Sequence, residues 1–161
     1  MGENQKIFMK VQYINPFLQA TTGLFKDYLG MDLVPEKPYI NTDPTRLGDV
    51  SAIIGLAGET TGAVVLSFTR DSAIAIVSKF AQRKYAALGN EVIDGVGELV
   101  NIIAGNAKKD LHDFKIMISL PGVVTGSDYR IHWPEGIPVV CIPFKSNFGD
   151  FSVNVSMRDI I

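Results

Sequence analysis

Cysteine and histidine are scarce in this chain of 161 residues, which contains one cysteine and two histidines. Cys141 has no second cysteine to pair with, so an intrachain disulfide is excluded. His112 and His132 lie far apart in the sequence without a Cys/His cluster, so the spacing of a structural zinc site is missing. We therefore expect a protein that holds no metal ion and works in a reducing, cytoplasmic compartment.

Long apolar runs and basic clusters are missing as well. No segment approaches the roughly 18 uninterrupted apolar residues of a transmembrane helix, and residues 1–9 lack the apolar run of a secretory signal. The formal net charge is -2, and no basic cluster is interleaved with aromatic residues. The sequence thus predicts that the protein has neither a membrane nor a nucleic acid as a partner.

The composition that remains is that of an ordinary globular protein, with 47% hydrophobic and 20% charged residues. The length suits one domain with a sizeable core. Met9 is a candidate natural start, which would make residues 1–8 an extension or tag remnant and residues 9–161 the single domain.

Hydrophobic periodicity and turn residues divide the chain into elements that recur in a similar order. The predicted helices cover residues 17–29, 71–84 and 90–112, with Asp71 as the cap of the second helix and Gly30 as the stop of the first. The predicted strands cover residues 10–14, 37–41, 50–57, 63–69, 115–124 (interrupted near Pro121), 139–145 and 151–157.

Each half of the chain therefore consists of a helix, a strand and a hairpin, and each hairpin closes on an Arg-Asp pair: Arg70-Asp71 and Arg158-Asp159. This order indicates an ancient duplication. We predict an α+β fold with a pseudo-twofold repeat, in which helices cover a mostly antiparallel sheet of six strands.

Two further features concern the second half. The loop at residues 126–138 carries Tyr129, His132 and Trp133. We expect it either to cover the end of the core or to contact a partner, since Trp and Tyr are favoured anchors. Cys141 alternates with apolar neighbours and is expected to be a buried, small hydrophobic residue.

One face of the helix at residues 90–112 carries unusually short polar residues. At about 100° per residue, five residues lie within about 80° of one another: Asp94, Glu98, Asn101, Gly105 and Lys108. Asn and Gly are poor helix formers, so this face departs from local propensity, which favours a functional role. Glu98 has no cationic residue three or four positions further on, so it is free to engage a cation on another molecule. Spacing alone also allows a solvated face without function.

Other catalytic signatures are incomplete. Gly95 and Gly97 lack the preceding strand and the third glycine of a dinucleotide fingerprint, and they favour instead the close approach of another backbone. The chain has no glycine-rich phosphate loop and no Ser/His/Asp set at a recognisable spacing. The polar face of the long helix remains the best candidate site.

The sequence Asp94-x-x-x-Glu98-x-x-Asn101, followed by Ile-Ile-Ala-Gly-Asn-Ala-Lys108, resembles the signature helix of the CheC/CheX/FliY family. The members of that family are bacterial chemotaxis phosphatases that act on the response regulator CheY. Pro121 stands near the place where the family has a proline on the next strand.

The N-terminal part of the chain indicates which type of family member it resembles. Residues 13–18, Tyr-Ile-Asn-Pro-Phe-Leu, are similar to the start of CheX proteins. The first helix contains no glutamate, and Gln19, Thr22 and Gly23 stand near the place equivalent to the motif. CheC-type members typically carry the motif on both helices, so the resemblance implies a CheX-type protein with one working site per chain.

The resemblance implies that this chain hydrolyses the aspartyl phosphate of a CheY-type receiver. Asn101 would position the attacking water, and Glu98 would dock to the receiver's active-site lysine. The further residues expected to contact the receiver are Asp94, Gly97, Gly105 and Lys108. The resemblance also implies that the chain needs no cofactor of its own, that Mg²⁺ is held by the receiver, and that two chains form a homodimer by pairing edge strands.

Two other functions stay open on the sequence. A non-catalytic adaptor would use the same fold and the same helix face to bind a receiver without hydrolysis. An enzyme that uses Glu98 as a general base on a small molecule would need a concave pocket, whereas a docking helix should be convex and open.

Overall fold

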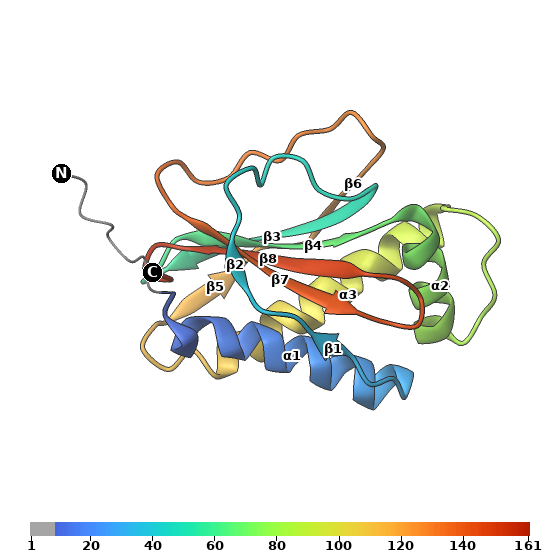
Figure 1. Ribbon diagram of the computed structural model, residues 1–161, viewed down its shortest axis with the longest axis horizontal. Coiled ribbons are helices and arrows are strands. Elements are labelled where there is room, and N and C mark those ends of the chain that lie inside the picture. The colour runs from blue at the N-terminus through green and yellow to red at the C-terminus, as the bar shows by residue number, and fades with distance from the viewer. Residues whose placement is uncertain (1–8) are drawn as a thin grey trace.

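The computed structural model describes residues 9–161, and the interpretation of residues 1–8 as an extension lies outside this range. A single sheet separates helices on one side from two long loops on the other (Figure 1). The helices are α1 (Val11–Leu29), α2 (Arg70–Ala81) and α3 (Asn90–Lys109). The strands are β1 (Val34–Pro35), β2 (Tyr39–Ile40), β3 (Val50–Gly58), β4 (Gly62–Phe68), β5 (Ile116–Ile118), β6 (Gly122–Thr125), β7 (Val139–Lys145) and β8 (Phe151–Met157).

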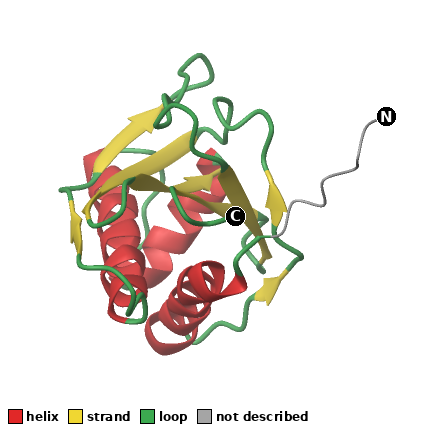
Figure 2. Cartoon of the chain, turned by 90° about the vertical axis from the view of Figure 1, so that its left-hand side faces the viewer, coloured by secondary structure: helices red, strands yellow, loops and turns green. Residues whose placement is uncertain are grey.

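The strands pair antiparallel in the order β1-β7-β8-β4-β3-β5. In addition, β2 pairs with β7 and β6 pairs with β3. The sheet is thus six strands wide and contains eight strand segments, because each outer position is shared by two short ones. The predicted α+β class and antiparallel sheet are confirmed, and the helices gather on one side of the strands (Figure 2).

The duplication is visible in the way the two halves interlock. Strands β1 and β2 follow α1 but pair with β7, and strands β5 and β6 follow α3 but pair with β3. Each half therefore places its outer strands against the hairpin of the other half. The middle residues of β4 and β8, Val65 and Asn154, pair with each other. A twofold arrangement requires this register.

Helix α1 begins earlier than the sequence predicted. Residues 10–14 were expected to form a strand, but helix α1 starts at Val11, and Tyr13, Ile14 and Phe17 are buried at helical spacing. Pro16 consequently lies inside the helix and not in its first turn. The predicted stop is confirmed, because Gly30 adopts φ 59° and its N–H donates to the carbonyl of Lys26.

The ends of the other helices differ from prediction by a few residues. Thr69 caps α2 in place of Asp71, because its hydroxyl oxygen accepts a hydrogen bond from the N–H of Ser72 at 3.2 Å. This helix ends at Ala81, before the predicted residue 84, where Gln82 adopts a left-handed backbone. Helix α3 ends at residue 109 and not at 112.

One predicted strand is shorter than expected, and the interruption predicted near Pro121 in another is confirmed. The strand at residues 37–41 is reduced to the two residues of β2. The strand at residues 115–124 consists of β5 and β6, separated around Pro121, which has no N–H to donate to a sheet. Both short outer strands, β2 and β6, begin directly after a proline, Pro38 and Pro121.

The loop at residues 126–138 covers the face of the sheet that is turned away from the helices. The Tyr129 hydroxyl lies 2.7 Å from that of Ser51, and the indole N–H of Trp133 donates to the carbonyl of Pro44 at 2.8 Å. The loop thus covers a face of the sheet, whereas the sequence had favoured a position over the end of the core. Cys141 is buried as predicted, and burial raises the pKa of its thiol.

Candidate functional site

Helix α3 presents one apolar face to the core and one polar face to solvent. The buried face includes Val96, Leu99, Val100 and Ile103, all fully inaccessible to solvent. On the opposite side, four predicted site residues are exposed: Asp94, Glu98, Asn101 and Lys108. Gly105 is half-buried and faces open space. The structure therefore brings five of the six predicted site residues to one solvent-facing surface.

Gly97 is the residue that differs from the prediction. It is buried, and a Cβ added there would lie 3.4 Å from Cγ2 of Val123 and 3.7 Å from Cγ of Pro121. Gly97 therefore faces β6 and Pro121, and a methyl group there would meet both at ordinary van der Waals distance. Gly95 is the analogous position toward α2, since an added Cβ would overlap the side chain of Val77.

The side chains of Glu98 and Asn101 are unengaged as far as residues 9–161 are concerned. No hydrogen bond or ion pair in the described part of the chain involves either side chain. A carboxylate of this kind is suited to an ammonium group on another molecule. A carboxamide can donate one hydrogen bond and accept another, and it does not titrate near neutral pH. The pair is thus available for a charged partner and for positioning a water molecule.

The β5–β6 connection flanks the polar face on the side of Gly97. Pro121 packs on that glycine, and the preceding residue, Leu120, is 90% exposed. This loop was not predicted as part of the site, apart from Pro121. Its signal in the sequence was the apolar residue placed directly before that proline.

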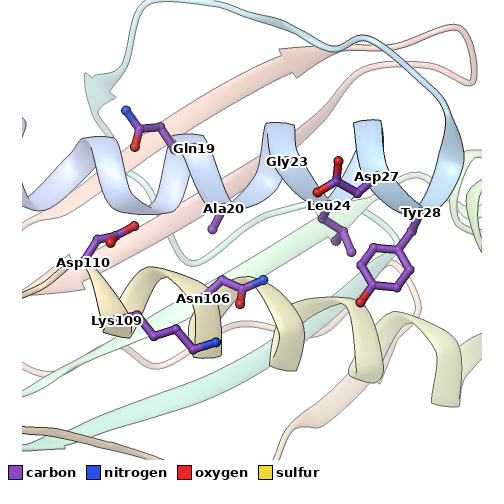
Figure 3. A pocket seen from close by; sticks show the side chains of 9 residues that line it. All are labelled: Gln19, Ala20, Gly23, Leu24, Asp27, Tyr28, Asn106, Lys109 and Asp110. Carbon is purple, nitrogen blue, oxygen red and sulfur yellow. The ribbon is translucent and has the colours of Figure 1, made fainter.

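A groove lies between α1 and the C-terminal part of α3 (Figure 3). Its volume is about 310 Å³, and Asn106 and Lys109 from α3 face Gly23 and Tyr28 from α1 across it. Glu98 and Asn101 line none of the five best-formed surface pockets of residues 9–161. These pockets therefore give no support to an enzyme that uses Glu98 on a small molecule.

Neither a metal site nor a membrane-spanning helix is found among residues 9–161. No cluster of three or more His, Cys, Asp or Glu side chains in this range is arranged to hold a metal ion. Within the same range, none of the helices combines the length and the apolar character needed to cross a membrane.

The first helix repeats the buried positions of α3 but not its polar pair. An alignment by spacing and burial sets Tyr13, Phe17, Thr21 and Leu24 of α1 against Val92, Val96, Val100 and Ile103 of α3. In this alignment Gln19 takes the position of Glu98, and Thr22 takes that of Asn101. The hydroxyl of Thr22 donates to the carbonyl of Leu18 at 3.1 Å, so it is bound to its own helix. The predicted absence of a second motif therefore has a structural counterpart.

Comparison with known proteins identifies the family. The family model for the chemotaxis phosphatase CheX matches residues 50–145, more than half of the chain. The chain belongs to the CheX family. The resemblance inferred from the sequence is thereby confirmed, and with it the expectation of a hydrolase that acts as a phosphatase.

Individual members of the family show similarity over most of the chain. CheY-P phosphatase CheX of Thermotoga maritima is 25% identical over 126 residues, covering 76% of this chain and 81% of the relative. The crystal structure of CheX from Desulfovibrio desulfuricans has a TM-score of 0.83 and 31% identity, covering 91% of this chain and 99% of the other. A CheX–CheY–BeF3–Mg complex from Borrelia burgdorferi has a TM-score of 0.77 and 28% identity, covering 92% and 99%.

Proposed function

We propose that this protein hydrolyses the aspartyl phosphate of a CheY-type response regulator. The observation that carries the proposal is the exposed pair of Glu98 and Asn101 on α3, neither of which has a partner among residues 9–161. The names of two relatives support it: one is called a CheY-P phosphatase, and another was crystallised together with CheY.

Asn101 positions the attacking water in this proposal. Phosphoryl transfer leaves little covalent chemistry for a protein to supply, so positioning dominates catalysis. The carboxamide oxygen accepts a hydrogen bond from the water, and its N–H₂ donates to a phosphoryl oxygen. Since the group does not titrate near neutrality, it orients the water without deprotonating it. A convex helix can insert such a side chain into the receiver's site.

Glu98 docks the helix in this proposal by pairing with a lysine of the receiver. Its exposed position on the same face, one turn before Asn101, supports this role. Asp94, Gly105 and Lys108 lie at the periphery of the contact. The chain needs no cofactor of its own, because the receiver holds the Mg²⁺ that neutralises the phosphoryl charge.

We also propose that the protein is a cytoplasmic homodimer that pairs through the edges of its sheet. At one outer edge of the sheet, β1 and β2 carry exposed apolar side chains, Val34 and Tyr39. Exposed edge strands with apolar side chains favour pairing with another chain. Analytical ultracentrifugation tests this point, and a monomer at micromolar concentration would contradict it.

The decisive experiment measures phosphate release. The protein is mixed with a CheY-type receiver from the same source that has been phosphorylated with acetyl phosphate. We expect release well above the receiver's own rate. Release at the basal rate despite measurable binding would identify the protein as a non-catalytic adaptor and would contradict the proposal.

A further inference from the structure

We propose that Leu120 is an apolar anchor through which the protein holds the receiver next to Asn101. This inference rests on the proposed function. Leu120 is 90% exposed, more than any other large hydrophobic side chain in residues 9–161. A single exposed leucine is common on protein surfaces, so the setting of this residue decides its meaning.

The backbone on both sides of Leu120 is held firmly. The N–H of Ser119 donates to the carbonyl of Gly55 at 3.0 Å, and the Ser119 hydroxyl accepts from the N–H of Gly55 at 2.8 Å. The same hydroxyl donates to the carbonyl of Leu120 itself at 3.0 Å. On the other side, Pro121 has a restricted backbone and packs toward Gly97. A side chain on such a support loses little backbone freedom when it is buried by a partner.

The position of this segment ties it to the candidate site. Pro121 contacts the helix at Gly97, which directly precedes Glu98 and lies about one turn before Asn101. A protein that covers Glu98 and Asn101 from the solvent side therefore reaches the β5–β6 connection as well. The surface formed by Leu120, Glu98 and Asn101 combines an apolar group with two polar ones, as protein interfaces commonly do.

The first half of the chain, whose helix α1 lacks the Glu and Asn pair, provides an independent observation. β2 and β6 each begin directly after a proline, so Lys37 stands before Pro38 where Leu120 stands before Pro121. The half that lacks Glu and Asn on its helix thus also lacks the exposed leucine. The apolar residue and the polar pair occur together, which indicates that they serve the same partner.

The test compares Leu120→Ala with the wild type in the phosphate-release assay. Loss of an apolar side chain that becomes buried in the complex should raise KM about tenfold. kcat should stay within about twofold, because Leu120 does not touch the reacting atoms. Titration with the beryllofluoride-loaded receiver should show the same loss in affinity. Leu120→Met keeps an apolar side chain of similar volume, so its KM and its affinity for the loaded receiver should be close to those of the wild type.

Met117→Ala is the matched control. Met117 is 65% exposed on the same segment, but it alternates with Ile116 and Ile118, which pack toward the helices, so it belongs to the opposite face of the sheet. We expect its KM to equal that of the wild type. Unfolding curves of both variants should match the wild type, since neither residue is part of the core.

The outcomes separate the two proposals. If the wild type accelerates phosphate release but Leu120→Ala has an unchanged KM and affinity, the anchor is wrong and the proposed function stands. An equal loss in Met117→Ala would also overturn the anchor, because the effect would not be specific to Leu120. If the wild type neither binds the receiver nor accelerates release, both proposals fail.

Discussion

The two halves of this protein share one backbone plan but differ on the surface of their helices. Several buried positions of α1 and α3 coincide, and each half contributes a hairpin and a proline-preceded outer strand to the same sheet. At the exposed positions, Glu98 and Asn101 of α3 are replaced by Gln19 and Thr22 of α1. The comparison teaches that the core maintains the repeat, whereas a few exposed side chains distinguish the halves.

The halves also differ beneath the exposed face. Gly97 lets Pro121 approach α3 closely, but Leu18 occupies the equivalent position of α1 and is partly buried against the core. The β5–β6 connection can therefore lie against its helix in a way that a larger residue would prevent. Asymmetry thus extends from the polar pair to the packing that supports it.

The largest expected effect separates Asn101 from its counterpart Thr22. Asn101→Ala should lower the receiver-stimulated rate of phosphate release about 100-fold or more, equal to roughly 2.7 kcal/mol, while binding is nearly kept. Thr22→Ala should leave both unchanged. Single-turnover kinetics with phosphorylated receiver and a parallel binding titration measure the two quantities. An Asn101→Ala protein with the wild-type rate would disprove the water-positioning role.

The next effect separates Glu98 from Gln19. Glu98→Ala should weaken binding of the phosphorylated receiver about 30-fold, or roughly 2 kcal/mol, because a charge in the receiver loses its partner. Turnover at subsaturating receiver should fall in parallel, and Gln19→Ala should alter neither. Calorimetry measures the affinity of each variant for the receiver. Equal affinities for Glu98→Ala and the wild type would show that this carboxylate does not dock the receiver.

A smaller effect concerns glycines in the two helices. Gly95→Ala should lower the free energy of unfolding by about 1–2 kcal/mol, because the new methyl group would overlap the buried side chain of Val77. At Gly23 in α1 an added methyl group would meet nothing within 4 Å. Gly23→Ala should therefore raise the free energy of unfolding by up to about 1 kcal/mol. Urea unfolding measures both. A stabilising Gly95→Ala would mean that α2 and α3 are less closely packed than described.

The smallest expected effect is that of transplanting the motif. Gln19→Glu with Thr22→Asn, made in the Asn101→Ala background, should recover less than about one-tenth of the wild-type rate, because small misplacements are costly in phosphoryl transfer. The chain still has Leu18 beneath the transplanted face and Lys37 in place of an exposed leucine. Phosphate release measures the recovery. Restoration of most of the rate would show that two exposed side chains suffice and that the support beneath them is unimportant.

Much of the fold was predictable because local patterns and tertiary packing agree. The β7–β8 hairpin was predicted with both strands at their observed limits, since alternating apolar residues flank a strong turn signal. Residues 10–14 were wrongly predicted as a strand, because five residues match a period of two as readily as the start of a helix. The packing of Tyr13 and Ile14 on the core decides for the helix.

The candidate site was predictable in part for a similar reason. Helical spacing places Glu98, Asn101 and their neighbours on one face whatever surrounds the helix, so their exposure was predicted correctly. The burial of Gly97 was not, because it depends on β6, a strand that is remote along the chain from the motif in the helix. The exposure of Leu120 was likewise not predicted, since a single leucine in a short connection has no periodic pattern.

The sequence by itself determined the class of the fold, the duplication and the one helix face with an unpaired Glu and Asn, because these depend on the periodicity of side chains along single elements. Only the tertiary structure decided which neighbours flank that face. It placed Pro121 against Gly97 and left the preceding residue, Leu120, in solvent. Such contacts join segments from different elements, and their geometry follows from packing the whole sheet against its helices.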